Sequence, residues 1–311
     1  MKPIYAGTYS AHKRNRGKLV FTIIILLQLA GVGAYLYIKS DKSKADKTPN
    51  PIDEPTGLTP DSAVITPTAP TTTSAETKAL IADARAEIAG GQLVAAQITL
   101  QNVVATVPDP EAIDLLGKTN MQLLKSSFMM PGKEYYVIQS GDYLQKIAKK
   151  FHITVALLKT MNGMESDKIR LGDRLLVFNG NFSIRVSKSR NELDLLNNGK
   201  LFKRYSVGTG KFGKTPAVKF TIVDKIPEPP WTRPSDNKRI EYGDPENVLG
   251  SRWIAIKSAD HPELTGFGIH GTWQRDSIGK QSSAGCIRML NEDVEELFDL
   301  VPRKISVTIT E

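Results

Sequence analysis

The chain has 311 residues, a formal net charge of +8 and a single cysteine. This length allows several domains, and one cysteine excludes a disulfide framework within the chain. No block of basic and aromatic residues follows residue 18, and the cysteine and four histidines lack the spacing of zinc ligands, so neither a nucleic-acid interface nor a metal or other cofactor is expected.

Residues 19–38 form an apolar segment, LVFTIIILLQLAGVGAYLYI, without a charged side chain. As a helix this segment reaches about 30 Å, the thickness of a bilayer's hydrocarbon core, which predicts a transmembrane anchor. Basic side chains flank it on both sides, so the charge bias is slight, but a short basic head before a first helix usually stays inside, and residues 1–18 are expected to be cytoplasmic. A cleaved signal peptide is the alternative. In both cases residues 39–311 are expected outside the cytoplasm, which predicts a single-pass protein of the inner membrane with its folded part in the periplasm or cell wall.

Two segments of different character follow the apolar one. Residues 39–75 are rich in proline, threonine and serine and have almost no large apolar side chains, which predicts a disordered, semi-extended linker. Residues 76–127 carry apolar side chains at helical spacing, with breaks at Gly90-Gly91 and at Pro108-Asp109-Pro110 and a third helix suggested after the second break. This rhythm resembles a single tetratricopeptide-like helical hairpin. A helical spacer or an oligomerising hairpin is the alternative, and the segment is a candidate surface for a protein partner.

Residues 134–178 have the pattern strand–helix–helix–strand. The first strand (135–138) leads through Ser140-Gly141-Asp142 into a helix, and Thr154 is the expected N-cap of a second helix. The final strand is expected over 174–178. This order and its side chains resemble a lysin motif (LysM), and the resemblance implies binding to glycans that contain N-acetylglucosamine, here peptidoglycan. A LysM fold kept as a spacer or protein contact is the alternative.

Residues 181–311 show mainly strand signals. The run 182–186 alternates in polarity, Asn197-Asn198-Gly199-Lys200 is a hairpin turn, and the last strand is expected over 305–309. One helix is expected with Asn291 as its cap. The whole chain is therefore predicted to be multidomain: a transmembrane helix, an α-helical hairpin, a small α+β LysM unit, and a mainly-β sandwich with a C-terminal helix.

The lone cysteine, Cys286, lies between glycine and isoleucine in SSAGCIRM, and His270 lies upstream in GIHGT. An exported protein usually carries cysteines in pairs, so a single one is an inert thiol, an intermolecular link or a nucleophile. The surrounding residues resemble the catalytic domain of YkuD-type L,D-transpeptidases. The matching segments are Gly208-Thr209-Gly210, Thr215-Pro216, Pro229-Pro230-Trp231, Leu249 to Ile254, Gly268 to Thr272, Ser277-Ile278-Gly279 and Ser283 to Met289.

The resemblance implies cysteine-dependent acyl transfer. A free thiol is mostly protonated at neutral pH, so His270 is expected, as an imidazolium, to lower the pKa of the Cys286 thiol and then to protonate the leaving amine. The backbone carbonyl of Gly271 is implied as the group that orients the imidazole. The turn at Gly285 is expected to present the N–H groups of Gly285 and Cys286 to the developing oxyanion.

Four further residues are assigned to substrate binding. Ser283 is the expected polar support, and Arg288 is expected to hold a substrate carboxylate, with an ion pair to Glu292 as the alternative. Trp231 and Trp273 are candidates for lining the cleft, with cover of the sheet as their alternative.

Two positions receive separate predictions. Ala284 stands where the family usually has histidine, in Ser/Thr-His-Gly-Cys. Because His270 matches the family's upstream histidine, activity is expected to survive, with the choice of acceptor or the rate altered. Trp253, within a predicted strand, is expected in the core.

The predicted function is a peptidoglycan L,D-transpeptidase that releases D-alanine from a tetrapeptide stem and forms a 3→3 crosslink, with no cofactor. An L,D-carboxypeptidase and an enzyme that attaches a lipoprotein to the wall are alternatives at the same site. A non-catalytic wall-binding scaffold is the alternative from another class.

Overall fold

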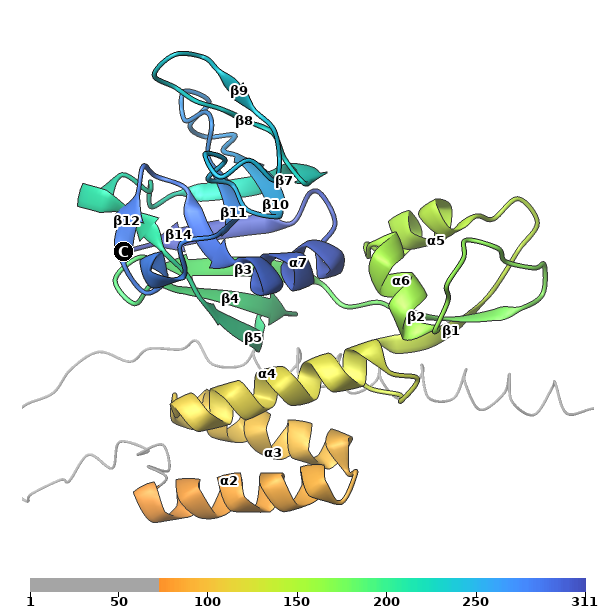
Figure 1. Cartoon of the computed structure of the whole chain (residues 1–311). Coiled ribbons are helices and arrows are strands. Elements are labelled where there is room, and N and C mark those ends of the chain that lie inside the picture. The colour runs from red at the N-terminus through yellow and green to blue at the C-terminus, as the bar shows by residue number, and fades with distance from the viewer. Residues whose placement is uncertain (1–72) are drawn as a thin grey trace, which may run out of the picture. The chain divides into compact units, whose positions relative to one another are not determined.

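A computed structural model describes residues 73–311, which belong to one compact unit (Figure 1). The predicted cytoplasmic head, the transmembrane segment and the linker up to residue 72 lie outside the described residues. Within 73–311, no helix is both long and apolar enough to cross a membrane.

Three helices occupy the segment assigned to a hairpin. They are α2 (Ser74–Ala89), α3 (Leu93–Thr106) and α4 (Pro110–Lys125). Thr73 and Glu76 form a capping box at the start of α2, which therefore begins within the last residues assigned to the linker. Asp109 caps α4, and a proline at its first position suits the helix start. Both breaks between the helices thus lie where glycine and proline occur in the sequence.

Helix α4 covers an edge of the large β-sheet. Strand β5 (Lys200–Ser206) is the last strand of that sheet, and the buried Asn120 of α4 donates from Nδ2 to the carbonyl of Phe202 at 2.7 Å. Gly117 allows the close approach, because a Cβ there would lie 3.1 Å from Lys203 Cγ. An uncovered edge strand exposes unpaired backbone groups. The helical segment therefore contacts the sheet through α4.

The LysM segment has the predicted order of elements: β1 (Lys133–Val137), α5 (Leu144–Lys150), α6 (Val155–Met161) and β2 (Arg174–Phe178). The two strands pair antiparallel. Thr154 caps α6 as predicted, since its Oγ1 accepts from the Leu157 N–H at 2.9 Å. Asn162, which ends α6, donates to the Leu158 and Leu176 carbonyls and ties the helix to β2.

The C-terminal part is built on one eight-stranded mixed sheet with the order β13-β11-β10-β7-β14-β3-β4-β5. The β-rich character of this part is as predicted, and its eight main strands are joined in one continuous hydrogen-bonded order. Its strands other than β5 are β3 (Phe182–Ser187), β4 (Glu192–Asn197), β7 (Lys219–Pro227), β10 (Arg252–Lys257), β11 (Gly268–Thr272), β13 (Ile287–Leu290) and β14 (Ser306–Thr310). Two short pairs accompany the sheet: β6 (Thr209–Gly210) with β12 (Gln281–Ser283), and β8 (Trp231–Thr232) with β9 (Arg239–Ile240).

The C-terminal helix α7 (Asn291–Leu300) packs on strands β10, β11 and β13 through buried Val294, Leu297 and Leu300. The prediction of Asn291 as its cap was wrong: Leu290 occupies the cap position and Asn291 is the first helical residue. The Asn291 Oδ1 instead accepts from the Ser251 N–H at 3.0 Å, which ties α7 to the segment before β10.

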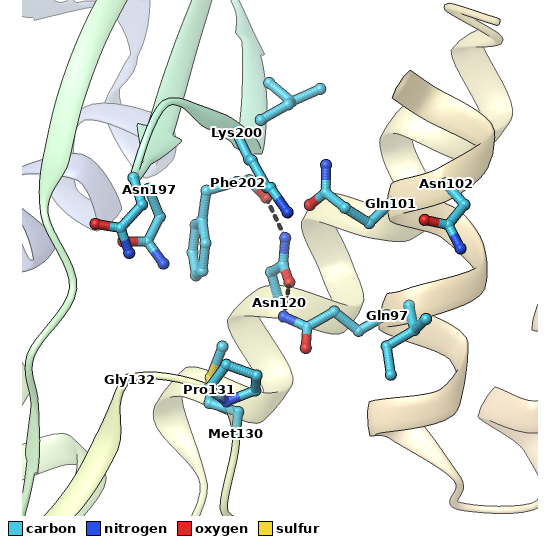
Figure 2. A pocket seen from close by; sticks show the side chains of 13 residues that line it. Gln97, Gln101, Asn102, Asn120, Met130, Pro131, Gly132, Asn197, Lys200 and Phe202 are labelled. Atoms are coloured by element: carbon cyan, nitrogen blue, oxygen red, sulfur yellow. Dashed lines mark hydrogen bonds between the residues drawn. The ribbon is translucent and has the colours of Figure 1, made fainter. Parts of the chain in front are cut away.

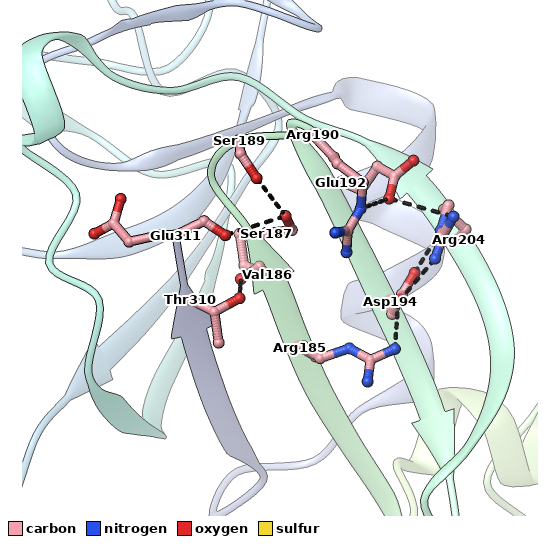
Figure 3. Close-up of polar contacts among 10 residues, drawn as sticks. All are labelled: Arg185, Val186, Ser187, Ser189, Arg190, Glu192, Asp194, Arg204, Thr310 and Glu311. Carbon is pink, nitrogen blue, oxygen red and sulfur yellow. Dashed lines mark hydrogen bonds and ion pairs between the residues drawn. The ribbon is translucent and has the colours of Figure 1, made fainter.

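Ion pairs between charged side chains link strands β3, β4 and β5, as Figure 3 shows. Asp194 of β4 is in register with Arg185 of β3 and Arg204 of β5, and pairs with them at 2.8 Å and 2.7 Å. Burial alone raises the pKa of the Asp194 carboxyl, but the hydrogen bonds and charges of the two arginines bring it below its ordinary value. These pairs hold β3, β4 and β5 together in the half of the sheet that does not carry Cys286 or His270.

Candidate active site

Neighbouring parallel strands place Cys286 and His270 together. His270 of β11 is in register with Arg288 of β13, and Cys286 directly precedes β13. Because side chains alternate along a strand, Cys286 and Arg288 lie on the same face of the sheet, which is also the face of His270. All three line one cavity of about 580 Å³. The structure therefore brings together the two residues that the sequence singled out.

His270 is buried and held by its neighbours. Its Nδ1–H donates to the Gly271 carbonyl at 2.6 Å, and the Leu249 carbonyl is a second backbone acceptor for the ring. The Trp253 indole stacks on the imidazole, with 5.7 Å between ring centroids and 27° between planes. Burial lowers the pKa of His270 to about 4, although the hydrogen bond to Gly271 opposes that shift. The side chain is therefore neutral at physiological pH.

The Cys286 thiol is also neutral in this structure. Its Sγ donates to the Gly266 carbonyl at 3.7 Å, and no hydrogen bond joins it to His270 within residues 73–311. Burial raises the pKa of the thiol, with the Gly268 N–H and the Arg288 charge acting in the opposite direction. Both pKa shifts favour the uncharged thiol and imidazole over the expected thiolate–imidazolium pair.

The burial of neutral His270 sets an acid limit to stability. Its pKa is about 4 when folded and 6.5 when exposed, so the unfolded chain binds more protons between these values. Stability is complete above about pH 6.5 and falls as the pH drops toward 4, by roughly 2 kcal/mol between about pH 7.5 and 5. Urea unfolding at both pH values measures this loss. His270→Gln should lack this component, and an equal loss in that variant would contradict its assignment to His270.

The turn before Cys286 is held by two buried hydroxyls. Ser283 Oγ donates to the Cys286 carbonyl at 2.6 Å and accepts from the Gly285 N–H at 3.0 Å. Thr215 Oγ1 donates to the Gly285 carbonyl at 2.7 Å and accepts from the Gly210 N–H at 2.8 Å. Gly285 has φ +142°, and a Cβ there would lie 3.0 Å from the Phe267 ring. Glycine is therefore required at this position.

These hydrogen bonds reduce the number of backbone N–H groups that are free at the predicted oxyanion site. The Gly285 N–H is already engaged by Ser283, contrary to the expectation that it is free. The Cys286 N–H donates to no group within the described residues 73–311. Of the two predicted donors, only the Cys286 N–H is left to meet a developing negative charge.

Thr215→Val is expected to lower the free energy of unfolding by about 2 kcal/mol, because it leaves the buried Gly210 N–H and Gly285 carbonyl without a partner. Valine keeps the shape of threonine, so packing is nearly unchanged. Thr215→Ser keeps the hydroxyl and serves as the matched control, with a smaller loss. Chemical denaturation of both variants makes the comparison, and equal losses would show that the methyl group rather than the hydroxyl stabilises the turn.

Arg288 presents an unpaired charge to the cavity. Its alternative partner Glu292 pairs instead with Arg275 at 2.7 Å. Arg288 Nη1 donates to Gln274 Oε1 at 3.3 Å, and its buried Nε has no hydrogen-bond partner within residues 73–311. Burial lowers the pKa of Arg288, but a guanidinium keeps its charge at any physiological pH.

The three tryptophans agree with the sequence expectation to different degrees. Trp231 lines the cavity with Cys286. Trp273 lies outside that cavity, is 54% exposed, and packs near Tyr242 with 6.4 Å between ring centroids. Trp253 was predicted in the core but lines the cavity and stacks on His270. Its alternating strand pattern predicted that it faces inward, and only strand pairing shows that His270 is its neighbour.

Asn247 is a site-forming residue that the sequence analysis missed. It is buried, and its Nδ2 donates to the carbonyls of Pro229, Ile240 and Glu241 while its Oδ1 accepts from the Leu249 N–H. These bonds fold the segment that carries Trp231 along the cavity. No local motif marks this asparagine, because its partners are set by the folded loop.

Within residues 73–311, no three His, Cys, Asp or Glu side chains gather as a metal site.

Comparison with known protein families gives two matches. A model of the L,D-transpeptidase catalytic domain (YkuD) matches residues 181–309, and a LysM domain model matches residues 136–178. YqjB of Bacillus subtilis is 40% identical over 127 residues, which cover 40% of this chain and 69% of that protein. YkuD of Bacillus licheniformis is 33% identical over 183 residues, which cover 56% of this chain and 98% of that protein. The names of both relatives place them among the L,D-transpeptidases.

Solved structures show weaker similarity. L,D-transpeptidase 3 from Mycobacterium tuberculosis, in complex with a faropenem-derived adduct, is 16% identical with a TM-score of 0.35, and the match covers 44% of this chain and 66% of that one. The catalytic domain of the E. faecium L,D-transpeptidase is 24% identical with a TM-score of 0.33, and the match covers 42% and 96% of the two chains.

Proposed function

This chain belongs to the YkuD family of L,D-transpeptidases and carries a LysM domain, and from that premise we propose that it crosslinks peptidoglycan with Cys286 as nucleophile. The observation that carries the proposal is the placement of Cys286 and His270 on one face of neighbouring strands, lining one cavity. An inert core thiol would not need an imidazole beside it on the same face of the sheet.

The first half-reaction is acylation of the enzyme. The Cys286 thiol turns from the Gly266 carbonyl toward His270 when substrate enters, since catalytic hydrogen bonds often form only in the complex. Nε2 takes the thiol proton as sulfur bonds to the carbonyl carbon of the third residue of a tetrapeptide stem. The C–N bond to the terminal D-alanine then breaks, and His270 returns the proton to the leaving amine. The products are a thioester on Cys286 and free D-alanine.

Two groups meet the charge of this reaction. The Cys286 N–H donates to the oxyanion that forms on the attacked carbonyl. Arg288, without a carboxylate partner in the cavity, binds a carboxylate of the stem or of the departing D-alanine through its planar guanidinium. Trp231 and Trp253 provide the apolar walls that exclude water from the thioester.

The second half-reaction transfers the acyl group. An amine of a neighbouring stem, typically the side chain of its diamino acid, attacks the thioester, loses a proton to His270 and restores the Cys286 thiol. The product is a 3→3 crosslink. The thioester conserves the energy of the cleaved amide, so ATP is not consumed.

Targeting is proposed from the remaining parts of the chain. The LysM domain (136–178) binds the glycan strands of the same wall that the catalytic domain modifies. Residues 19–38 anchor the protein in the inner membrane and place the enzyme in the periplasm; their composition supports this proposal. Protease digestion of intact spheroplasts tests the placement, because a cytoplasmic enzyme would stay protected.

Incubation of the full chain with defined disaccharide-tetrapeptides tests the reaction. Mass spectrometry is expected to show free D-alanine, crosslinked dimers, and an acylated protein whose adduct maps to Cys286. Tripeptide monomers without dimers would make water the acceptor and the protein an L,D-carboxypeptidase. A lipoprotein supplied as acceptor tests wall attachment in the same way. The absence of both D-alanine and any adduct would favour a non-catalytic scaffold.

A further inference from the structure

A second cavity, of about 350 Å³, lies apart from Cys286 between the helical segment and the sheet (Figure 2). Helix α3, helix α4, the segment 130–132 and the hairpin between β4 and β5 form its walls. Its volume lies in the range of small-ligand pockets. Six carboxamide side chains line it: Gln97, Gln101, Asn102, Asn120, Asn197 and Asn198.

One of these carboxamides is fixed by the fold. Asn120 is 1% exposed, donates from Nδ2 to the Phe202 carbonyl at 2.7 Å, and accepts on Oδ1 from Gln97 Nε2 at 2.6 Å. Figure 2 shows this chain of hydrogen bonds crossing the cavity from α3 to β5. Asn120 is therefore the structural part of the wall, and Gln97 is held with its Oε1 unengaged.

The other polar groups are unengaged as well. The side chains of Gln101, Asn102, Asn198 and Lys200 make no hydrogen bond or ion pair within residues 73–311. Asn197 Oδ1 is buried and has no donor there. Asn197 Oδ1 lies against Gly180, while the free carboxamides of the lining give this cavity donors and acceptors that suit a polar ligand.

The lining restricts the chemistry of such a ligand. No carboxylate lines the cavity to compensate the charge of a cation, and the single Lys200 does not suit a polyanion. An apolar ligand would strand the carboxamides without hydrogen bonds. Each carboxamide both donates and accepts, which matches a neutral ligand rich in hydroxyl and acetamido groups. Ile98 and Met130 add apolar contacts suited to the C–H faces of such a ligand.

We infer that this cavity binds a neutral stretch of N-acetylated glycan, as a second glycan site beside the LysM domain. The inference rests on the proposed function only in taking peptidoglycan as the polymer that the chain meets. Pro131 and Gly132 line the cavity and directly precede β1 of the LysM domain, so two glycan contacts lie close in the chain. Two linked contacts raise the effective affinity for one polymer above that of either alone.

Peptide-resolved hydrogen exchange of the full chain in detergent, with and without chitotetraose, tests the inference. The glycan is expected to slow exchange in 94–104 and 197–202 in addition to the LysM segment. Gln101→Met keeps length and helix propensity but removes the carboxamide. It should abolish the slowing at the cavity, weaken binding there roughly tenfold, and leave the LysM effect intact. Gln122→Met, on the exposed side of α4 outside the cavity, is the matched control and should behave as wild type.

Three results would overturn the inference. Slowed exchange confined to the LysM segment would show that the cavity takes no glycan. Slowing by a free tetrapeptide stem instead of chitotetraose would assign the cavity to the peptide. Wild-type behaviour of both Gln101→Met and a second variant, Lys200→Met, would show that the lining does not contact the ligand. Cys286→Ala should retain glycan binding here, so a failure of the proposed catalysis leaves this test readable.

Discussion

Replacement of Cys286 by alanine is expected to reduce D-alanine release from a tetrapeptide stem by about 10⁴-fold or more, to the uncatalysed background. Cys286 is the only cysteine in the chain, so no second thiol substitutes for it. The lost step is formation of the thioester, without which neither transfer nor hydrolysis follows. The measurement is initial-rate detection of D-alanine, together with mass spectrometry for dimers and for the protein adduct.

The alanine variant should remain folded. Cys286 is only partly buried, and its thiol makes one weak hydrogen bond, to the Gly266 carbonyl. A thermal midpoint close to that of the wild type confirms that the rate loss is chemical. Cys286→Ser keeps a hydroxyl at the same place and should be almost as inactive, because an alcohol is a much weaker nucleophile at neutral pH. Dimer formation by the alanine variant at a rate near that of the wild type would refute the nucleophile.

His270→Gln is expected to lower kcat by about 10³-fold or more, with little change in KM. Glutamine can still donate toward the Gly271 carbonyl but cannot accept the thiol proton. The structure adds a second expectation, because thiol and imidazole are both neutral and not hydrogen-bonded. Alkylation of Cys286 by iodoacetamide at neutral pH should then differ little between wild type and variant.

The two measurements separate two mechanisms. A variant with normal alkylation and lost turnover supports a base that acts only when substrate is bound. A tenfold or larger fall in alkylation would show that a thiolate–imidazolium pair exists before substrate binds, against the pKa directions seen here. His261→Gln is the matched control, because His261 lies in a loop outside the cavity and its side chain makes an exposed contact with Glu263. It should match wild type in both measurements.

Elements controlled by local chemistry were predictable from the sequence. The LysM order follows from alternating strands, the Thr154 cap and the turn after α6, all of which act within a few residues. The helix breaks at Gly90-Gly91 and before Pro110 are local in the same way. The Asn291 cap failed because a distant N–H, that of Ser251, takes its side chain.

The residues of the site were likewise predictable where their surroundings are local in sequence, and not where their contacts are distant. Cys286 and His270 were identifiable because nucleophile, base and adjacent glycines stand in short contiguous segments, and the family membership of those segments is now shown by comparison. Thr215, Trp253 and Asn247 were not, because each acts on residues far from it in the chain. The engagement of the Gly285 N–H by Ser283 is local, but the orientation of that hydroxyl depends on how the turn closes.

By itself the sequence determined which residues are candidates for the chemistry and which short elements form, because side-chain type, caps and periodicity act over a few residues. Only the tertiary structure decided how these residues and elements are placed relative to one another. The parallel pairing of β11 with β13 puts His270 beside Cys286, and burial raises the pKa of the thiol and lowers that of the imidazole. The cover of β5 by α4 creates the carboxamide cavity. Strand pairing, burial and cavities arise from contacts between distant segments, and no local pattern encodes their partners.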